Sequence, residues 1–155
     1  MNNDEFIFFI DDDLHIKVKE PLVTQTFESL KNKSDATVLI FSTFDEAFAK
    51  GLELKNKVGY CVFDPTLEDG AALSKDYLIE LTLFRINSLV KFVNSEMKIV
   101  ILTSLNSIYG EKLRKMLETE GLPAFSGLLF KQRFCTHELL AEELSNEILK
   151  LFLNA

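Results

Sequence analysis

The chain has 155 residues, enough for one compact domain with a continuous core and too few for two domains of usual size. Hydrophobic residues make up 47% of it and charged residues 26%, as in ordinary globular proteins. A net charge of −7 argues against a surface built to neutralise nucleic-acid phosphates, and no apolar run approaches the roughly 20 residues that span a bilayer. We therefore predict one cytoplasmic domain over residues 1–155, without direct nucleic-acid binding or membrane insertion.

Five short apolar runs, each about the length of a buried strand, alternate along the chain with segments of helical spacing. The predicted strands are Glu5–Ile10, Thr37–Ser42, Val58–Phe63, Lys98–Leu102 and Ala124–Phe130. The predicted helical segments are Leu14–Asn32, Thr43–Lys55, Ala71–Asn94, Leu105–Glu120 and Thr136–Leu153. The apolar runs are nearly continuous, which is typical of parallel strands covered on both faces by helices. The order predicts an α/β fold: a (βα)5, doubly wound, five-stranded parallel sheet.

Three helical segments carry further signals. Pro21 disfavours a helix interior, so we expect the first helix to begin near Lys17 or later, with Pro21 close to its first turn. The third segment, 71–94, is long, and most of its apolar positions are expected to pack in the core, although part of it could form a partner surface. The last segment has an apolar stripe predicted to pack on the sheet: Leu140, Leu144, Ile148, Leu151 and Phe152.

Chemically active side chains follow four of the predicted strands, at the sheet edge where open parallel sheets bind ligands. Four aspartates, a lysine and two hydroxyl residues should meet there: Asp11, Asp12 and Asp13 after the first strand, Asp64 after the third, Thr103 and Ser104 after the fourth, and Lys131 after the fifth. Clustered carboxylates repel one another unless a hard divalent cation offsets their charge, and Mg²⁺ suits such ligands. With the cation bound, one carboxylate could attack phosphorus while the lysine ammonium stabilises charge on the phosphoryl oxygens.

Four segments resemble the receiver family of response regulators over essentially the whole chain: FFIDDD, CVFDPTLEDG, KIVILTS and LLFKQRF. This similarity to stand-alone, chemotaxis-type receivers implies a flavodoxin-like fold in which Asp64 is the phosphoacceptor. It further implies Mg²⁺ held by Asp12 directly, by Asp11 through water, by Asp64 and by the backbone carbonyl of Thr66. Thr103 and Lys131 would contact the phosphoryl group.

The same resemblance implies a role in two-component signalling and not in enzymatic turnover, beyond slow autodephosphorylation. A histidine kinase or phosphotransfer protein would phosphorylate Asp64, and a conformational change would relay the event to a separate protein partner. The expected responsive face surrounds Tyr109, Leu128 and the range 136–144. A homodimer is compatible with the sequence.

Several positions depart from the receiver pattern. The loop from Asp64 to Gly70 is short, Pro65 removes a backbone donor beside the acceptor, and Gln132 stands where a cis-proline commonly follows the lysine. Leu128 stands where many receivers carry an aromatic switch residue. These departures support an alternative in which the chain is a degenerate receiver-like interaction module that is not phosphorylated.

A second, weaker alternative is a phosphatase of the haloacid dehalogenase type, with Asp11 as nucleophile and Asp13 as acid. It lacks a later acidic pair at a strand end and leaves Asp64 without a role. Cys61 and Cys135 fit neither a disulfide framework nor a zinc site, and we expect both to be reduced. His15 and His137 stand singly and carry no predicted chemistry.

Overall fold

The computed structural model describes residues 1–11, 21–66, 74–122, 124–131 and 140–154. Its centre is a sheet of five strands in the order β2-β1-β3-β4-β5, and every neighbouring pair is parallel. The strands are β1 (Phe6–Ile10), β2 (Thr37–Phe41), β3 (Val58–Phe63), β4 (Lys98–Thr103) and β5 (Phe125–Phe130). The predicted (βα)5 parallel fold is confirmed, with strand boundaries shifted by one residue at most.

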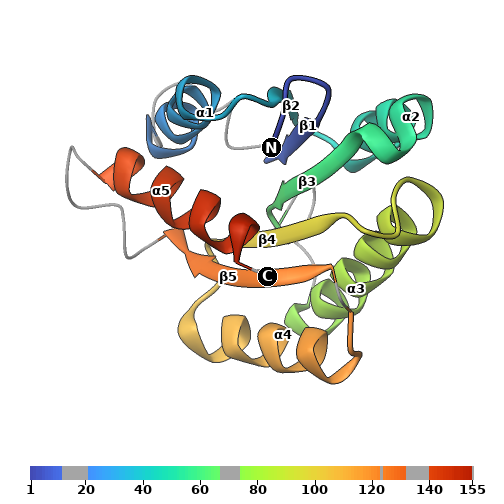
Figure 1. Cartoon of the computed structure of the whole chain (residues 1–155). Helices are drawn as coiled ribbons and strands as arrows, with labels where there is room; N and C mark the ends of the chain where they lie inside the picture. The colour runs from blue at the N-terminus through green and yellow to red at the C-terminus, as the bar shows by residue number, and fades with distance from the viewer. Residues whose placement is uncertain (12–20, 67–73, 123, 132–139, 155) are drawn as a thin grey trace.

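Two layers of helices enclose the sheet (Figure 1). The helices are α1 (Pro21–Lys33), α2 (Phe44–Leu54), α3 (Lys75–Phe92), α4 (Ser107–Thr119) and α5 (Leu140–Leu153). Helices α1 and α5 lie side by side on one face, whereas α2, α3 and α4 cover the other, so the sheet is doubly wound. No helix in the described ranges is long and apolar enough to cross a membrane.

The helices begin where short polar side chains can accept hydrogen bonds from the first turn. Thr43 accepts from the Glu46 amide at the start of α2, Ser74 from the Tyr77 amide at α3, and Asn106 from the Tyr109 amide at α4. These three helices, α2, α3 and α4, therefore begin one, four and two residues after the starts predicted from apolar spacing. The described part of α1 begins at Pro21, and residues 12–20 lie outside the described ranges, so the predicted start of the first helix stays a prediction.

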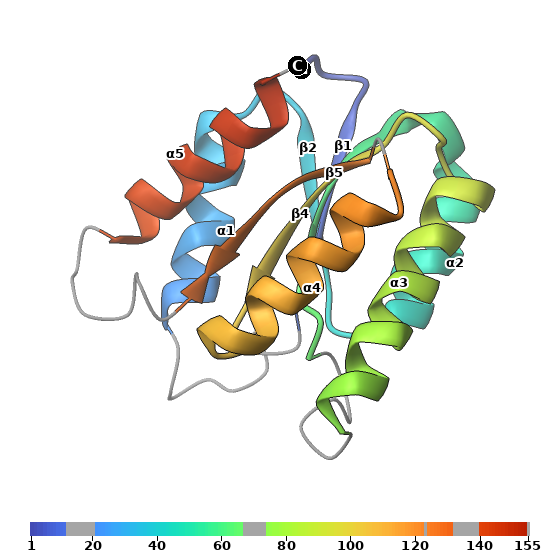
Figure 2. The same ribbon diagram turned by 90° about the horizontal axis from the view of Figure 1, so that it is seen from below.

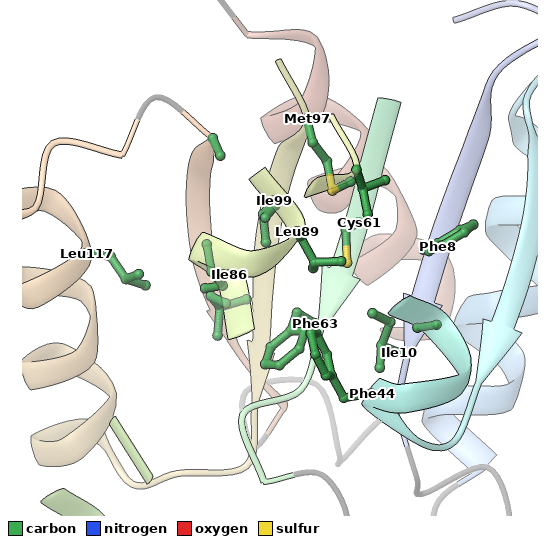
Figure 3. Packing of buried hydrophobic residues seen from close by; sticks show 14 of the residues in the cluster. Phe8, Ile10, Phe44, Cys61, Phe63, Ile86, Leu89, Met97, Ile99 and Leu117 are labelled. Carbon is green, nitrogen blue, oxygen red and sulfur yellow. The ribbon is translucent and has the colours of Figure 1, made fainter. Parts of the chain in front are cut away.

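Two apolar clusters fill the space between the sheet and its helices. The larger lies under α2, α3 and α4 and contains buried rings from three elements: Phe8, Phe44 and Phe63. Figure 3 shows Phe63 beside Phe44, with Cys61 and Met97 further along the same cluster. Cys61 is a free, fully buried thiol whose pKa is raised by burial, so its predicted role as a small apolar residue is confirmed. Cys135 lies outside the described residues.

The smaller cluster lies under α1 and α5. Leu144, Ile148 and Phe152 are fully buried in it, while Leu140 and Leu151 are half-buried against it. The predicted apolar stripe of the last helix therefore packs on the sheet, as expected. Lys33 of α1 also links this helix to α5 outside the cluster. Its ammonium donates to Asn146 Oδ1 at 2.8 Å and lies 3.4 Å from Glu142 Oε1.

Candidate functional site

Sheet topology brings two aspartates together at the carboxyl edge of the sheet. The central strands β1 and β3 are paired with Ile10 opposite Phe63, so the next residues on each strand, Asp11 and Asp64, emerge side by side. The Asp64 amide donates to the Ile10 carbonyl at 3.0 Å, which extends the ladder to the acid itself. Both carboxylates are only 1% exposed.

Lys131 joins these acids from the edge strand β5. It is the first residue after β5 and is itself 1% exposed. Its ammonium lies 2.9 Å from Asp11 Oδ2 and donates to Asp64 Oδ2 at 3.1 Å. Burying three charged groups is unfavourable unless they neutralise one another, so this cluster is a functional candidate more than a stabilising device.

The other oxygen of Asp64 is held by its own turn. The Thr66 amide donates to Asp64 Oδ1 at 2.9 Å, and the Thr66 hydroxyl donates to the same oxygen at 2.8 Å. This is an Asx-type turn, and Pro65 suits its second position because the missing N–H is not needed there. Both carboxylate oxygens of Asp64 therefore already have donors.

The two hydroxyl residues after β4 differ in position. Thr103 is the last residue of β4, is fully buried, and its hydroxyl accepts from the Leu105 amide at 3.0 Å. Ser104 is exposed, and its hydroxyl lies 3.4 Å from that of Thr66. The sequence predicted only a backbone carbonyl role for Thr66, and it placed Ser104 at this edge without a partner residue. The Asp-Pro-Thr pattern was the available signal, because Asp and Thr favour this turn.

A close helix contact positions the lysine. Phe130, which immediately precedes Lys131, packs its ring against Gly110 of α4, and a Cβ at Gly110 would overlap that ring. Glycine therefore allows α4 to approach the end of β5. Leu128 and Tyr109 of the predicted responsive face are half-buried against the larger cluster.

The donor chemistry of this edge fits Mg²⁺ in part. Asp11 and Asp64 supply two carboxylates, and the Thr66 backbone carbonyl follows in the same turn, which are ligand types that Mg²⁺ accepts. Among the described residues, no group of three His, Cys, Asp or Glu side chains could enclose a metal. Asp12, Asp13 and Gln132 lie outside the described residues, so the third predicted carboxylate is not placed.

Comparison with known protein families and with curated proteins finds no match to this chain. Solved structures do match. A CpaE pilus assembly protein from Caulobacter crescentus CB15 aligns with a TM-score of 0.59 at 15% identity, covering 99% of this chain and 97% of that one. A CpaE2 pilus assembly protein from Sinorhizobium meliloti 1021 aligns at 0.58 and 13% identity, with 94% and 98% covered.

A response regulator, DrrB from Thermotoga maritima, aligns with a TM-score of 0.57 at 21% identity. The alignment covers 99% of this chain and 53% of DrrB, so this chain spans about half of that protein. At such identities the likeness concerns the fold. The chain has the flavodoxin-like, receiver-like fold, and its charged cluster lies at the carboxyl edge of that sheet.

Proposed function

We propose that this chain is a receiver-like signalling module that accepts a phosphoryl group on Asp64. The proposal rests on the buried cluster in which Asp64 Oδ2 contacts the Lys131 ammonium beside Asp11. A lone aspartate at a turn would need no buried cation. An acid placed next to a fixed ammonium is suited to carry a transferred anionic group.

In the proposed reaction an Asp64 carboxylate oxygen attacks phosphorus and the bond from phosphorus to the donor breaks. The donor group leaves with the electron pair and takes a proton from water. Lys131 would neutralise a phosphoryl oxygen, while Thr103 and the exposed Ser104 offer hydroxyls at the end of β4. Mg²⁺ bound by Asp11, Asp12, Asp64 and the Thr66 carbonyl would supply charge neutralisation at the phosphoryl oxygens.

Access to Asp64 requires a local rearrangement. Its carboxylate is 1% exposed and both oxygens have donors. The contact easier to open is that from Thr66, because Thr66 is half-buried and only two residues away. We propose that opening of this turn frees Oδ1 to attack while Lys131 keeps Oδ2 oriented.

The donor is proposed to be a histidine kinase or a phosphotransfer protein, and the readout a change in binding to a separate protein. These partners rest on the receiver resemblance and on the receiver-like fold. The haloacid dehalogenase alternative is less well supported, because it assigns no role to Asp64, which contacts Lys131 directly.

A second candidate function is an interaction module that is never phosphorylated. The observation that favours it is the closed state of Asp64, whose buried carboxylate oxygens already accept from Thr66 and Lys131. In that case the charged cluster would only define the shape of this edge for a partner.

One experiment separates the two. The protein is incubated with acetyl phosphate and Mg²⁺, and its intact mass is compared with that of Asp64→Asn. Asp35→Asn, an exposed acid before β2, is the matched control. A phosphate-sized increment in the native chain and the control, lost in Asp64→Asn, supports the acceptor. No increment in a folded sample supports the interaction module.

A further inference from the structure

The outer face of α3 carries an aromatic stripe that the core does not use. Tyr77 is 52% exposed, Phe84 67% and Phe92 50%, with half-buried Leu81 between the first two. Spacings of four, three and eight residues keep these side chains on one side of the helix. Figure 2 shows α3 running beside α2, with its outer side turned away from the sheet. Large exposed aromatics in a row indicate a contact surface.

The opposite face of the same helix explains why the stripe is not needed for folding. Leu78, Ile86 and Leu89 are fully buried in the larger cluster and hold α3 on the sheet. Of the stripe, Phe92 packs against the Phe48 ring of α2, with centroids 6.2 Å apart, yet remains half exposed. This contact positions the Phe92 end of the stripe within the single chain.

The stripe is nearly symmetric about Phe84. Tyr77 precedes Phe84 by seven residues and Phe92 follows it by eight, which places them about 10.5 Å and about 12 Å along the helix axis. A second α3 lying antiparallel, with its Phe84 near the first, would bring each Tyr77 opposite the partner copy's Phe92 within about 1.5 Å. Such self-complementarity is what a two-fold interface requires.

The charges along the stripe have the same complementarity. Exposed Glu80 lies in the first half of the stripe, and Lys91 lies in the second, with its ammonium 5.3 Å from the centre of the Phe92 ring. Lys55 adds a second cation there, because it donates to the Phe92 carbonyl at 3.0 Å. In an antiparallel pair Glu80 of each copy approaches Lys91 of the other. A chain of net charge −7 gains most from association where its own cations meet its own acids.

We propose that the outer face of α3 is the interface between two copies of this chain, arranged antiparallel about a two-fold axis near Phe84. The contact is one helix face wide, so the dimer is weak and depends on concentration. The proposal concerns a surface distinct from the Asp64 cluster and requires no phosphorylation.

The first test measures self-association by sedimentation velocity, from low micromolar to submillimolar protein, without phosphodonor. Phe84→Glu places a charge at the two-fold axis and is expected to weaken the dimer at least about tenfold, as for a central aromatic anchor. Ile108→Glu is the matched control, because Ile108 is a 75% exposed apolar residue on α4 outside the stripe. Circular dichroism verifies that both variants fold.

Two results would overturn the proposal: a native chain that stays monomeric throughout the series, or a dimer that Ile108→Glu disrupts as strongly as Phe84→Glu. The second test is a charge exchange. Glu80→Lys and Lys91→Glu should each self-associate more weakly than the native chain. In either variant, positions 80 and 91 of opposite copies carry like charges, and the two-fold axis makes two such pairs in each dimer. A mixture of the two should form a heterodimer tighter than either variant alone, and no gain on mixing contradicts the antiparallel arrangement.

Discussion

The carboxyl edge of the sheet and the outer face of α3 are both exceptions to the rule that charged residues are exposed and apolar residues buried. The edge buries charged side chains, whereas the α3 face exposes apolar ones. At the edge, Asp11, Asp64 and Lys131 are charged and 1% exposed. On α3, Phe84 is apolar and 67% exposed. Neither arrangement favours the folded monomer, because buried charges lose hydration and an exposed ring gains nothing from folding. A molecule with an otherwise conventional core thus has its exceptions at the two surfaces for which we propose contacts with other molecules.

The largest effect is expected when the charged cluster loses its cation. Lys131→Met leaves two buried carboxylates facing each other, and should lower the free energy of unfolding by about 3–5 kcal/mol. Urea denaturation measures this change. Lys112→Met removes an exposed lysine that pairs with Asp76, and it is expected to leave the urea midpoint unchanged. Equal midpoints for the two variants would show that the buried lysine contributes no more than a surface one.

The two faces of α3 give the next contrast. Ile86→Ala opens a cavity in the larger cluster and should lower the free energy of unfolding by about 2–5 kcal/mol. Phe84→Ala, two residues earlier on the exposed face, should change it by less than about 0.5 kcal/mol. Both are measured by thermal unfolding at low protein concentration. A large loss from Phe84→Ala would mean that the stripe belongs to the monomer's own packing.

Added Mg²⁺ should stabilise the charged edge and not the α3 face. At ten times its dissociation constant, the ion would raise the free energy of unfolding by about 1.4 kcal/mol if it binds only the folded chain. Thermal unfolding with MgCl₂, against NaCl of equal ionic strength, measures the effect. Asp11→Asn should remove most of it, whereas Phe84→Ala should retain it. The same gain in Asp11→Asn would exclude Asp11 as a ligand.

The smallest effect concerns the turn that covers Asp64. Thr66→Val removes the hydroxyl that donates to Asp64 Oδ1 at 2.8 Å and keeps the shape of the side chain. One such bond contributes about 0.5–1.5 kcal/mol. Because its loss makes the turn easier to open, acetyl phosphate should label Asp64 a few times faster, and intact-mass analysis over time measures this rate. Thr43→Val, at the distant α2 cap, is the control. A slower reaction in Thr66→Val would indicate that the hydroxyl assists the transfer instead of closing the site.

The apolar periodicity was sufficient to predict the five strands and their parallel order along the chain. Continuous runs such as Lys98–Thr103 can only be buried on both faces, and this requires helices on each side of the sheet. Helix starts were less accurate, because apolar spacing does not register capping residues such as Ser74, which sets the beginning of α3 at Lys75. The placement of Asp12 and the bond before Gln132 stay predictions, since both lie outside the described residues.

The sequence by itself determined which groups end each strand, because residue type and strand position are local properties: Asp11 after β1, Asp64 after β3 and Lys131 after β5. Only the tertiary structure decided that Lys131 Nζ contacts both acids, that Thr66 closes Asp64, and that Phe84 faces outward. Those outcomes depend on strand order, on close approach at Gly110 and on which side of α3 meets the sheet. Helical spacing alone marks two apolar sides on α3, and packing in three dimensions selects the one that is buried.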